Sequence, residues 1–172
     1  MSRLFLPILS LSLLLAACSP SLNWREVPLA GGELKALLPC KPDKASRKQS
    51  LAAQELDITM LGCEAGGALY AVSMAELGAP DRALAVQVQW QANLLGNMQA
   101  TSSANSSFAI KGAAPQLDPV RLTAAGVGPD GRRVQAQGVW FARGAHLYHA
   151  VIYAERISAE MSEPFFGGLE LQ

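Results

Sequence analysis

The chain has few charged residues and few of the side chains that most often carry out chemistry. Charged residues make up 16% of its 172 residues, with 14 basic against 14 acidic, and it contains two histidines and three cysteines. Without a positive net charge, the sequence lacks the electrostatic attraction that nucleic-acid binding requires. The spacings C-x-x-C, H-E-x-x-H and G-x-S-x-G do not occur, so no zinc site, metalloprotease helix or serine nucleophile elbow is indicated. We therefore predict no enzymatic activity, no cofactor, no metal and no nucleic-acid partner.

Residues 1–17 have the layout of an export signal. Arg3 supplies a positive start, Leu4–Leu15 is apolar, and two alanines precede Cys18. The pattern resembles the lipobox of bacterial lipoproteins, which implies cleavage before Cys18 and a diacylglycerol on its sulfur. Ser19 follows, and by the same resemblance this implies export to the periplasmic face of the outer membrane. The apolar run is shorter than the roughly 20 residues that span a bilayer, so a retained transmembrane helix is the less favoured alternative.

Cleavage would leave a lipidated tether at residues 18–22 and a single domain at residues 23–172, which is long enough to bury its own core. With Cys18 assigned to lipid, Cys40 and Cys63 remain as an even pair in an oxidising compartment. A disulfide between them is favoured over two buried thiols, and it requires Cα atoms within about 7 Å of each other.

Hydrophobic alternation predicts strands at residues 23–29, 33–38, 55–61, 69–77, 120–127, 133–142, 147–154 and 169–171. Pro80 begins a predicted helix that runs to about Gln99. Its core face is predicted to carry Leu84, Val88, Leu95 and Met98, with Leu94 and Ala92 to the side. Because strands flank one long helix without alternating βαβ units, we predict an α+β fold. It consists of a mainly antiparallel β-sheet packed against one long helix, with short additional helical turns such as residues 158–163.

Two polar segments are predicted to lie outside regular strands. The densest basic run, Lys41, Lys44, Arg47 and Lys48, is predicted to be a solvated loop. Residues 101–107 are rich in serine and threonine and are predicted to be a loop that leads into an edge strand at residues 108–111.

Several short segments together resemble the PsbP-like domains. Pro39-Cys40-Lys41-Pro42 ends an apolar strand as the P-x-K-P turn does in that family. The later elements of that family are resembled by four further segments: Ala68–Val72, the helix at residues 80–99, Gly131–Tyr153 and Pro164–Phe166. The resemblance implies an antiparallel sheet flanked by helices and a non-enzymatic accessory or binding role, and it assigns no active residue. A disulfide between the two remaining cysteines is not expected of the family at large.

The histidines and paired carboxylates are assigned structural or surface roles. His146 and His149 are three residues apart on a predicted strand, so they point to opposite faces and cannot share a metal ion. Glu55 and Asp57 lie on one face of a predicted strand. A solvent-exposed face of the sheet explains these two carboxylates more simply than acid–base catalysis does. Ser73 lacks the flanking glycines of a nucleophile elbow.

The segment from Ala83 to Ile110 contains no charged residue. The solvent side of its helix is predicted to carry Gln89, Asn93 and Asn97, with Trp90 toward the border. This stripe is either an uncharged solvated surface or a partner-binding site, since interface centres are depleted of charge and enriched in aromatics. The predicted function is a lipid-anchored, non-enzymatic accessory or binding protein of the cell envelope. The alternative is a periplasm-facing carrier of a small apolar ligand held between sheet and helix.

Overall fold

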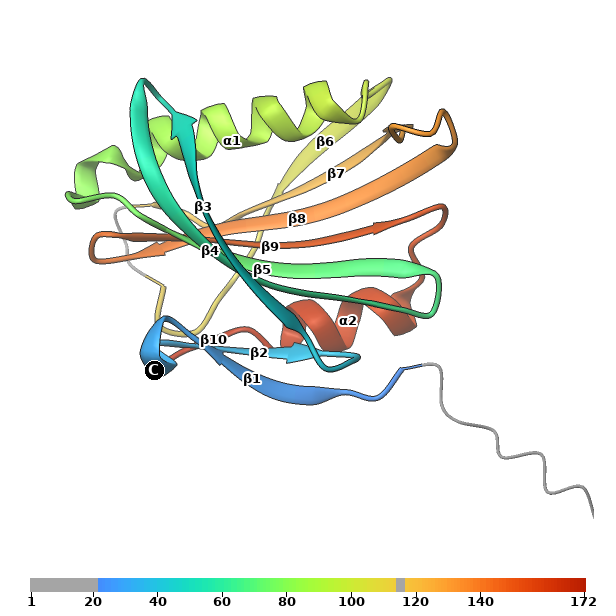
Figure 1. Cartoon of the computed structure of the whole chain (residues 1–172), viewed down its shortest axis with the longest axis horizontal. Coiled ribbons are helices and arrows are strands. Elements are labelled where there is room, and N and C mark those ends of the chain that lie inside the picture. Colours follow the sequence, from blue (N-terminus) through green and yellow to red (C-terminus); the bar gives the residue numbers. More distant parts are fainter. Residues whose placement is uncertain (1–21, 114–116) are drawn as a thin grey trace, which may run out of the picture.

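The computed structural model describes residues 22–113 and 117–172, whose arrangement is shown in Figure 1. The strands are β1 (Arg25–Leu29), β2 (Leu34–Leu38), β3 (Asp43–Leu51), β4 (Gln54–Ala65), β5 (Ala68–Glu76), β6 (Ser102–Ser107), β7 (Val120–Val127), β8 (Arg133–Arg143), β9 (His146–Ala154) and β10 (Glu170–Leu171). The helices are α1 (Ala83–Asn97) and α2 (Ala159–Gly167), and short 3-10 turns cover Ala30–Gly32 and Pro80–Arg82. The predicted signal segment, residues 1–17, and Cys18 lie outside the described residues. Among the helices described, none is long and apolar enough to cross a membrane.

The main sheet has seven strands in the order β3-β4-β5-β9-β8-β7-β6, and β1, β2 and β10 form a small second sheet. All the neighbouring strands within both sheets are antiparallel. Tight turns join β4 to β5, β7 to β8 and β8 to β9, whereas the segment containing α1 separates β5 from β6. The mainly antiparallel α+β class, the β4–β5 hairpin and the C-terminal meander are therefore confirmed.

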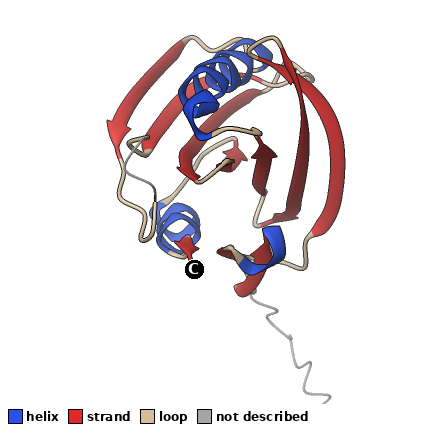
Figure 2. Ribbon diagram, turned by 90° about the vertical axis from the view of Figure 1, so that its left-hand side faces the viewer, coloured by secondary structure: helices blue, strands red, loops and turns tan. Residues whose placement is uncertain are grey.

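A separate hydrophobic core lies on each face of the main sheet. On one face, Val86 and Trp90 of α1 pack with Trp140 of β8. On the other, Leu34 of the small sheet and Phe165 of α2 belong to the second core. Figure 1 shows α1 on one side of the sheet and α2 with β1 and β2 on the other, and Figure 2 shows the curvature of the sheet between them. The expectation of a single long helix against the sheet is thus corrected, because two helices cover opposite faces.

Both edge strands of the main sheet fall where the sequence analysis predicted loops. The basic run lies mostly in β3, and the serine-rich segment forms β6. Residues 108–111 are not a strand, although Lys111 makes an isolated bridge to Glu170. An edge strand is paired on one side only, and most of β3 and all of β6 are exposed, so neither needs the apolar alternation that marks a half-buried strand.

The C-terminal helix is longer than the single turn predicted at residues 158–163. Ser158 occupies the N-cap position, but its side chain makes no capping hydrogen bond. The helix continues through Pro164 to Gly167 and buries Phe165 and Phe166. Burial of these two aromatic rings against the small sheet explains why the segment stays helical where the sequence suggested a lead into the last strand.

Candidate partner-binding surface

The side of α1 that faces the sheet is formed by Ala83, Val86, Gln87, Trp90 and Leu94, all of them buried. The Trp90 ring lies 5.1 Å from the ring of His149, measured between centroids. The predicted core face was wrong for Leu84 and Val88, which point to solvent. It was right for Leu94 and Met98, which are buried, and for Leu95, which packs against the core. Apolar residues occupy several sides of this helix, so periodicity alone did not distinguish them. The large Trp90 ring gains the most from burial, and its spacing from Val86 and Leu94 was the signal that could have identified the buried side.

The solvent side of α1 combines apolar and amide side chains. Leu84 and Val88, one helical turn apart, are 60% and 57% exposed. Gln89 Nε2 donates a hydrogen bond to Asn93 Oδ1 at 2.9 Å, and Asn97 is exposed one turn further on. The apolar pair and the amides line opposite borders of the solvent-facing half of the helix, with exposed Ala85 between them. We call the five residues on these two borders the α1 surface. An exposed helix face without a single charge is the kind of surface found at the centre of protein interfaces.

The structure brings together three of the four residues predicted as a partner-binding stripe. Gln89 and Asn97 are exposed and Asn93 is half-buried, so all three reach the solvent side. Trp90 is 9% exposed and belongs to the core, which corrects its predicted place at the border of the stripe. Sequence reasoning missed Leu84 and Val88 because it had assigned them to the core.

A small hollow lies beside Trp90 where strands β3, β4, β5 and β9 pass each other. Its volume is about 130 Å³, and its lining includes Arg47, Met60, Ser73, Trp90, His149 and Tyr153. Ligand pockets typically measure about 300–1,000 Å³, so this hollow is small for a carried molecule.

Ser73 and His149 face each other across β5 and β9 within this hollow. They are 3% and 5% exposed, and the His149 ring stacks on Trp140 at a centroid distance of 4.2 Å. Burial lowers the pKa of His149 to about 3, so the imidazole is neutral and a weak base at neutral pH. The lining contains no carboxylate that could orient the ring, and the pair does not have the geometry of a hydrolase triad.

Glu33 ties the small sheet to one end of the main sheet. Its Oε2 accepts hydrogen bonds from His146 Nδ1 at 2.7 Å and from the Tyr148 hydroxyl at 2.6 Å, and its Oε1 lies 3.7 Å from Arg143 Nε. Burial alone would raise the pKa of Glu33, but the hydrogen bonds from Tyr148 and His146 and the nearby positive charges hold it below its ordinary value. This cluster is a structural clasp between β2 and the β8–β9 hairpin.

The histidines lie on opposite faces of β9, as predicted from their spacing. His146 contacts Glu33, whereas His149 packs between Trp90 and Trp140 on the other face. In the part of the chain that the structure describes, no three histidine, cysteine, aspartate or glutamate side chains gather as a metal site would require.

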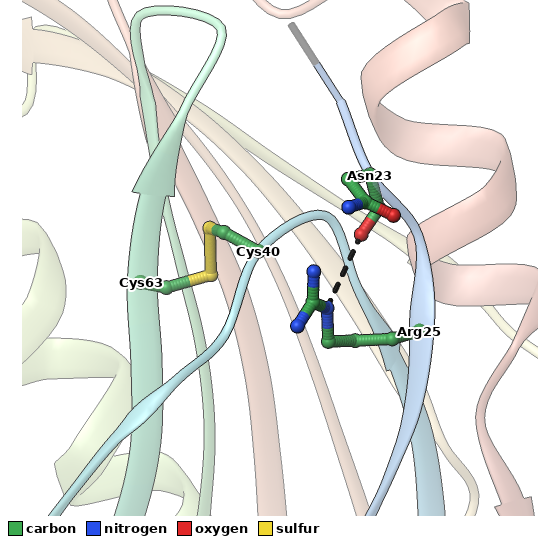
Figure 3. Close-up of a disulfide and its surroundings, with 4 residues drawn as sticks. All are labelled: Asn23, Arg25, Cys40 and Cys63. Atoms are coloured by element: carbon green, nitrogen blue, oxygen red, sulfur yellow. Dashed lines mark hydrogen bonds between the residues drawn. A yellow bond between two sulfur atoms is a disulfide. The ribbon is translucent and has the colours of Figure 1, made fainter. Parts of the chain in front are cut away.

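A disulfide forms a second clasp at the opposite end of β2. Cys40 follows β2 and Cys63 lies in β4, with their sulfurs bonded and their Cα atoms 6.0 Å apart (Figure 3). This confirms the predicted pair. Beside it, the Asn23 N–H donates to the Pro39 carbonyl at 2.7 Å, and Arg25 Nε donates to the Asn23 carbonyl at 3.5 Å. The small sheet is therefore fastened to the main sheet at both ends of β2.

Comparison with known proteins assigns no family to the chain. No family model matches it, and no curated protein does. A crystal structure of a protein of unknown function from Pseudomonas aeruginosa is similar at 13% identity and a TM-score of 0.39, over 82% of this chain and 89% of that one. A likeness this weak carries no functional argument. The resemblance to PsbP-like domains stays a prediction.

Proposed function

We propose that the chain is a lipid-anchored, non-enzymatic accessory protein of the bacterial cell envelope that binds another envelope protein through the α1 surface. The observation that carries the binding role is the exposure of Leu84 and Val88, at 60% and 57%, on a helix without a charged residue. Water solvates such a face poorly, so covering it with an apolar or amide-rich partner is favourable. The amides of Gln89 and Asn93 would then supply directional hydrogen bonds at the rim.

The pattern that ends in Cys18 supports the membrane anchor. Several acyl chains on one cysteine would make release from the membrane slow, whereas one chain binds only marginally. Intact mass of the purified protein tests this step, since we expect a chain that begins at Cys18 and carries lipid. Retention of residues 1–17, or membrane binding of Cys18→Ala as tight as that of the unaltered protein, would refute it.

Site-directed crosslinking in intact cells tests the binding role. A photoreactive residue at Val88 should give one discrete adduct with another envelope protein. The same residue at Glu160, exposed on α2 across the sheet, serves as the matched control and should give none. Asn93→Lys should abolish the Val88 adduct while lowering the free energy of unfolding by no more than about 1 kcal/mol, because Asn93 is half-buried and accepts one side-chain hydrogen bond. Equal adducts from both positions, or an unchanged Val88 adduct in a folded Asn93→Lys protein, would reject the α1 surface.

The alternative function, a carrier of a small apolar ligand, needs a pocket that encloses most of the ligand. The hollow beside His149 measures about 130 Å³, less than half the lower end of the usual range of about 300 Å³. The larger hollows, of about 320–750 Å³, are more open at the surface and enclose less of any ligand. These hollows together support the accessory role over the carrier.

A further inference from the structure

The strand β6 leaves one whole edge of the main sheet unpaired. It is the last strand in the sheet order, it pairs with β7 alone, and its six residues are all exposed. Its sequence, Ser-Ser-Ala-Asn-Ser-Ser, contains no charge, no proline and no bulky side chain. Edge strands of natural proteins are usually protected against pairing by lysine, proline or a bulge. The strand β6 contains neither lysine nor proline, and its register with β7 is regular from Ser102 to Ser107.

The register shows which backbone groups of β6 are free. The Phe108 N–H donates to the Pro119 carbonyl at 3.0 Å, one step beyond the Ser107–Val120 pair of the same ladder. Alternate residues of an antiparallel strand bond to the same neighbour, so Ser106 and Ala104 also direct their backbone groups to β7. The N–H and C=O groups of the intervening residues, Ser103, Asn105 and Ser107, consequently point away from the sheet.

The opposite edge of the sheet, β3, differs from β6 because it carries exposed charged side chains. Along β3, Lys44, Arg47 and Lys48 are exposed. Two copies brought together along β3 would set these positive side chains against one another, which is unfavourable. Two copies brought together along β6 meet no such repulsion, because the whole segment from Ala83 to Ile110 is uncharged.

We propose that β6 is a docking edge for a second copy of this chain, which joins it as an antiparallel strand about a two-fold axis through Asn105. In this register Asn105 pairs with the Asn105 of the second copy, and Ser103 pairs with its Ser107. Each outward N–H then meets an outward C=O, and the contact is self-complementary as a closed dimer requires. The small side chains of Ser103 and Ser107 let the two backbones approach. This inference is independent of the function proposed for the α1 surface.

Substitutions at Asn105 separate the backbone contribution from that of the side chain. Asn105→Pro removes an N–H that points away from β7, so it breaks no hydrogen bond within the sheet, and Asn105→Ala keeps that N–H as the matched control. Sedimentation equilibrium of the full chain in density-matched detergent should show a dimer. Asn105→Pro should raise its dissociation constant by at least about tenfold, given two hydrogen bonds lost across the axis. Asn105→Ala should stay within about twofold of the unaltered chain.

Amide hydrogen exchange of the unaltered protein keeps the proposal testable if Asn105→Pro does not fold. Protection of the Ser103, Asn105 and Ser107 amides should rise with protein concentration, while Ala104 and Ser106 should be protected at every concentration. A chain that stays monomeric, a dimer equally sensitive to Asn105→Ala and Asn105→Pro, or open-ended assemblies in place of a dimer would overturn the proposal. Exchange at Ser103, Asn105 and Ser107 that is fast at all concentrations would do so as well.

Discussion

Replacement of Glu33 tests whether its carboxylate holds the two sheets together. Glu33 accepts hydrogen bonds from His146 Nδ1 at 2.7 Å and from the hydroxyl of Tyr148 at 2.6 Å. The Tyr148 side chain is fully buried, so in Glu33→Ala its hydroxyl loses its acceptor where water does not easily replace it. A buried donor left without a partner costs about 1–3 kcal/mol, and a hydrogen bond to a charged group contributes about 1.5–3 kcal/mol.

The exposure of Glu33 reduces the expected loss. Its side chain is 26% exposed, so solvent screens part of its interaction with the His146 and Arg143 groups. We expect Glu33→Ala to lower the free energy of unfolding by about 2 kcal/mol, which is about 4–8 °C in Tm for a domain of this size. Urea and thermal unfolding at pH 7, with the disulfide intact, measure both. Glu26→Ala is the matched control, since Glu26 is 61% exposed and its pair with Lys35, at 3.4 Å, contributes under about 0.5 kcal/mol.

The pH dependence of the difference gives a second test. The pKa of Glu33 is lowered in the folded state from 4.5, so the unfolded chain takes up a proton at higher pH than the folded chain does. The stabilisation by Glu33 is fully present above about pH 4.5 and is lost as the pH falls toward its folded pKa. The difference in free energy of unfolding between the unaltered protein and Glu33→Gln should therefore become smaller below about pH 4.5. Two results would refute the role of Glu33 in joining the two sheets. One is an equal loss of unfolding free energy in Glu33→Ala and Glu26→Ala, and the other is a stability difference between the unaltered protein and Glu33→Gln that does not change between pH 7 and pH 3.

Three further predictions concern the core and the second clasp. Trp90→Ala should lower the free energy of unfolding by about 3 kcal/mol, and Leu84→Ala should change it by under about 0.5 kcal/mol; equal losses in urea would mean that α1 packs by another side. Replacing both Cys40 and Cys63 by serine should cost about 3 kcal/mol, because the pair closes a loop with a sequence separation of 23. A reductant should then destabilise the unaltered protein and leave the variant unchanged. His149→Phe should flatten the fall of stability between pH 6.5 and about 3, where the unfolded histidine binds a proton that the folded one excludes. Parallel falls in both proteins would contradict this.

The strands of the sheet interior could be predicted because each has at least one face in a core. Leu56 and Ile58 alternate with exposed Glu55 and Asp57 along β4, and this period of two indicates a half-buried strand. The Cys40–Cys63 disulfide could also be predicted, because an even number of cysteines after export limits the possible pairings. The contacts of Glu33 could not be predicted, since the histidine, tyrosine and arginine that surround it are more than 100 residues away along the chain.

Two of the parts that sequence reasoning placed wrongly, the buried side of α1 and the strand β6, share one physical property. A charged side chain indicates which side of a helix faces water, and it also protects a strand edge against pairing. Between Ala83 and Ile110 there is no charge, so Leu84 and Trp90 were equal candidates for the core, and β6 had the composition of a loop. The same lack of charge leaves the solvent side of α1 and the free edge of β6 without the repulsion that would keep another protein away. The segment hardest to interpret from sequence is therefore also where the folded chain is best suited to make contacts, and its two surfaces can be tested separately, at Val88 and at Asn105.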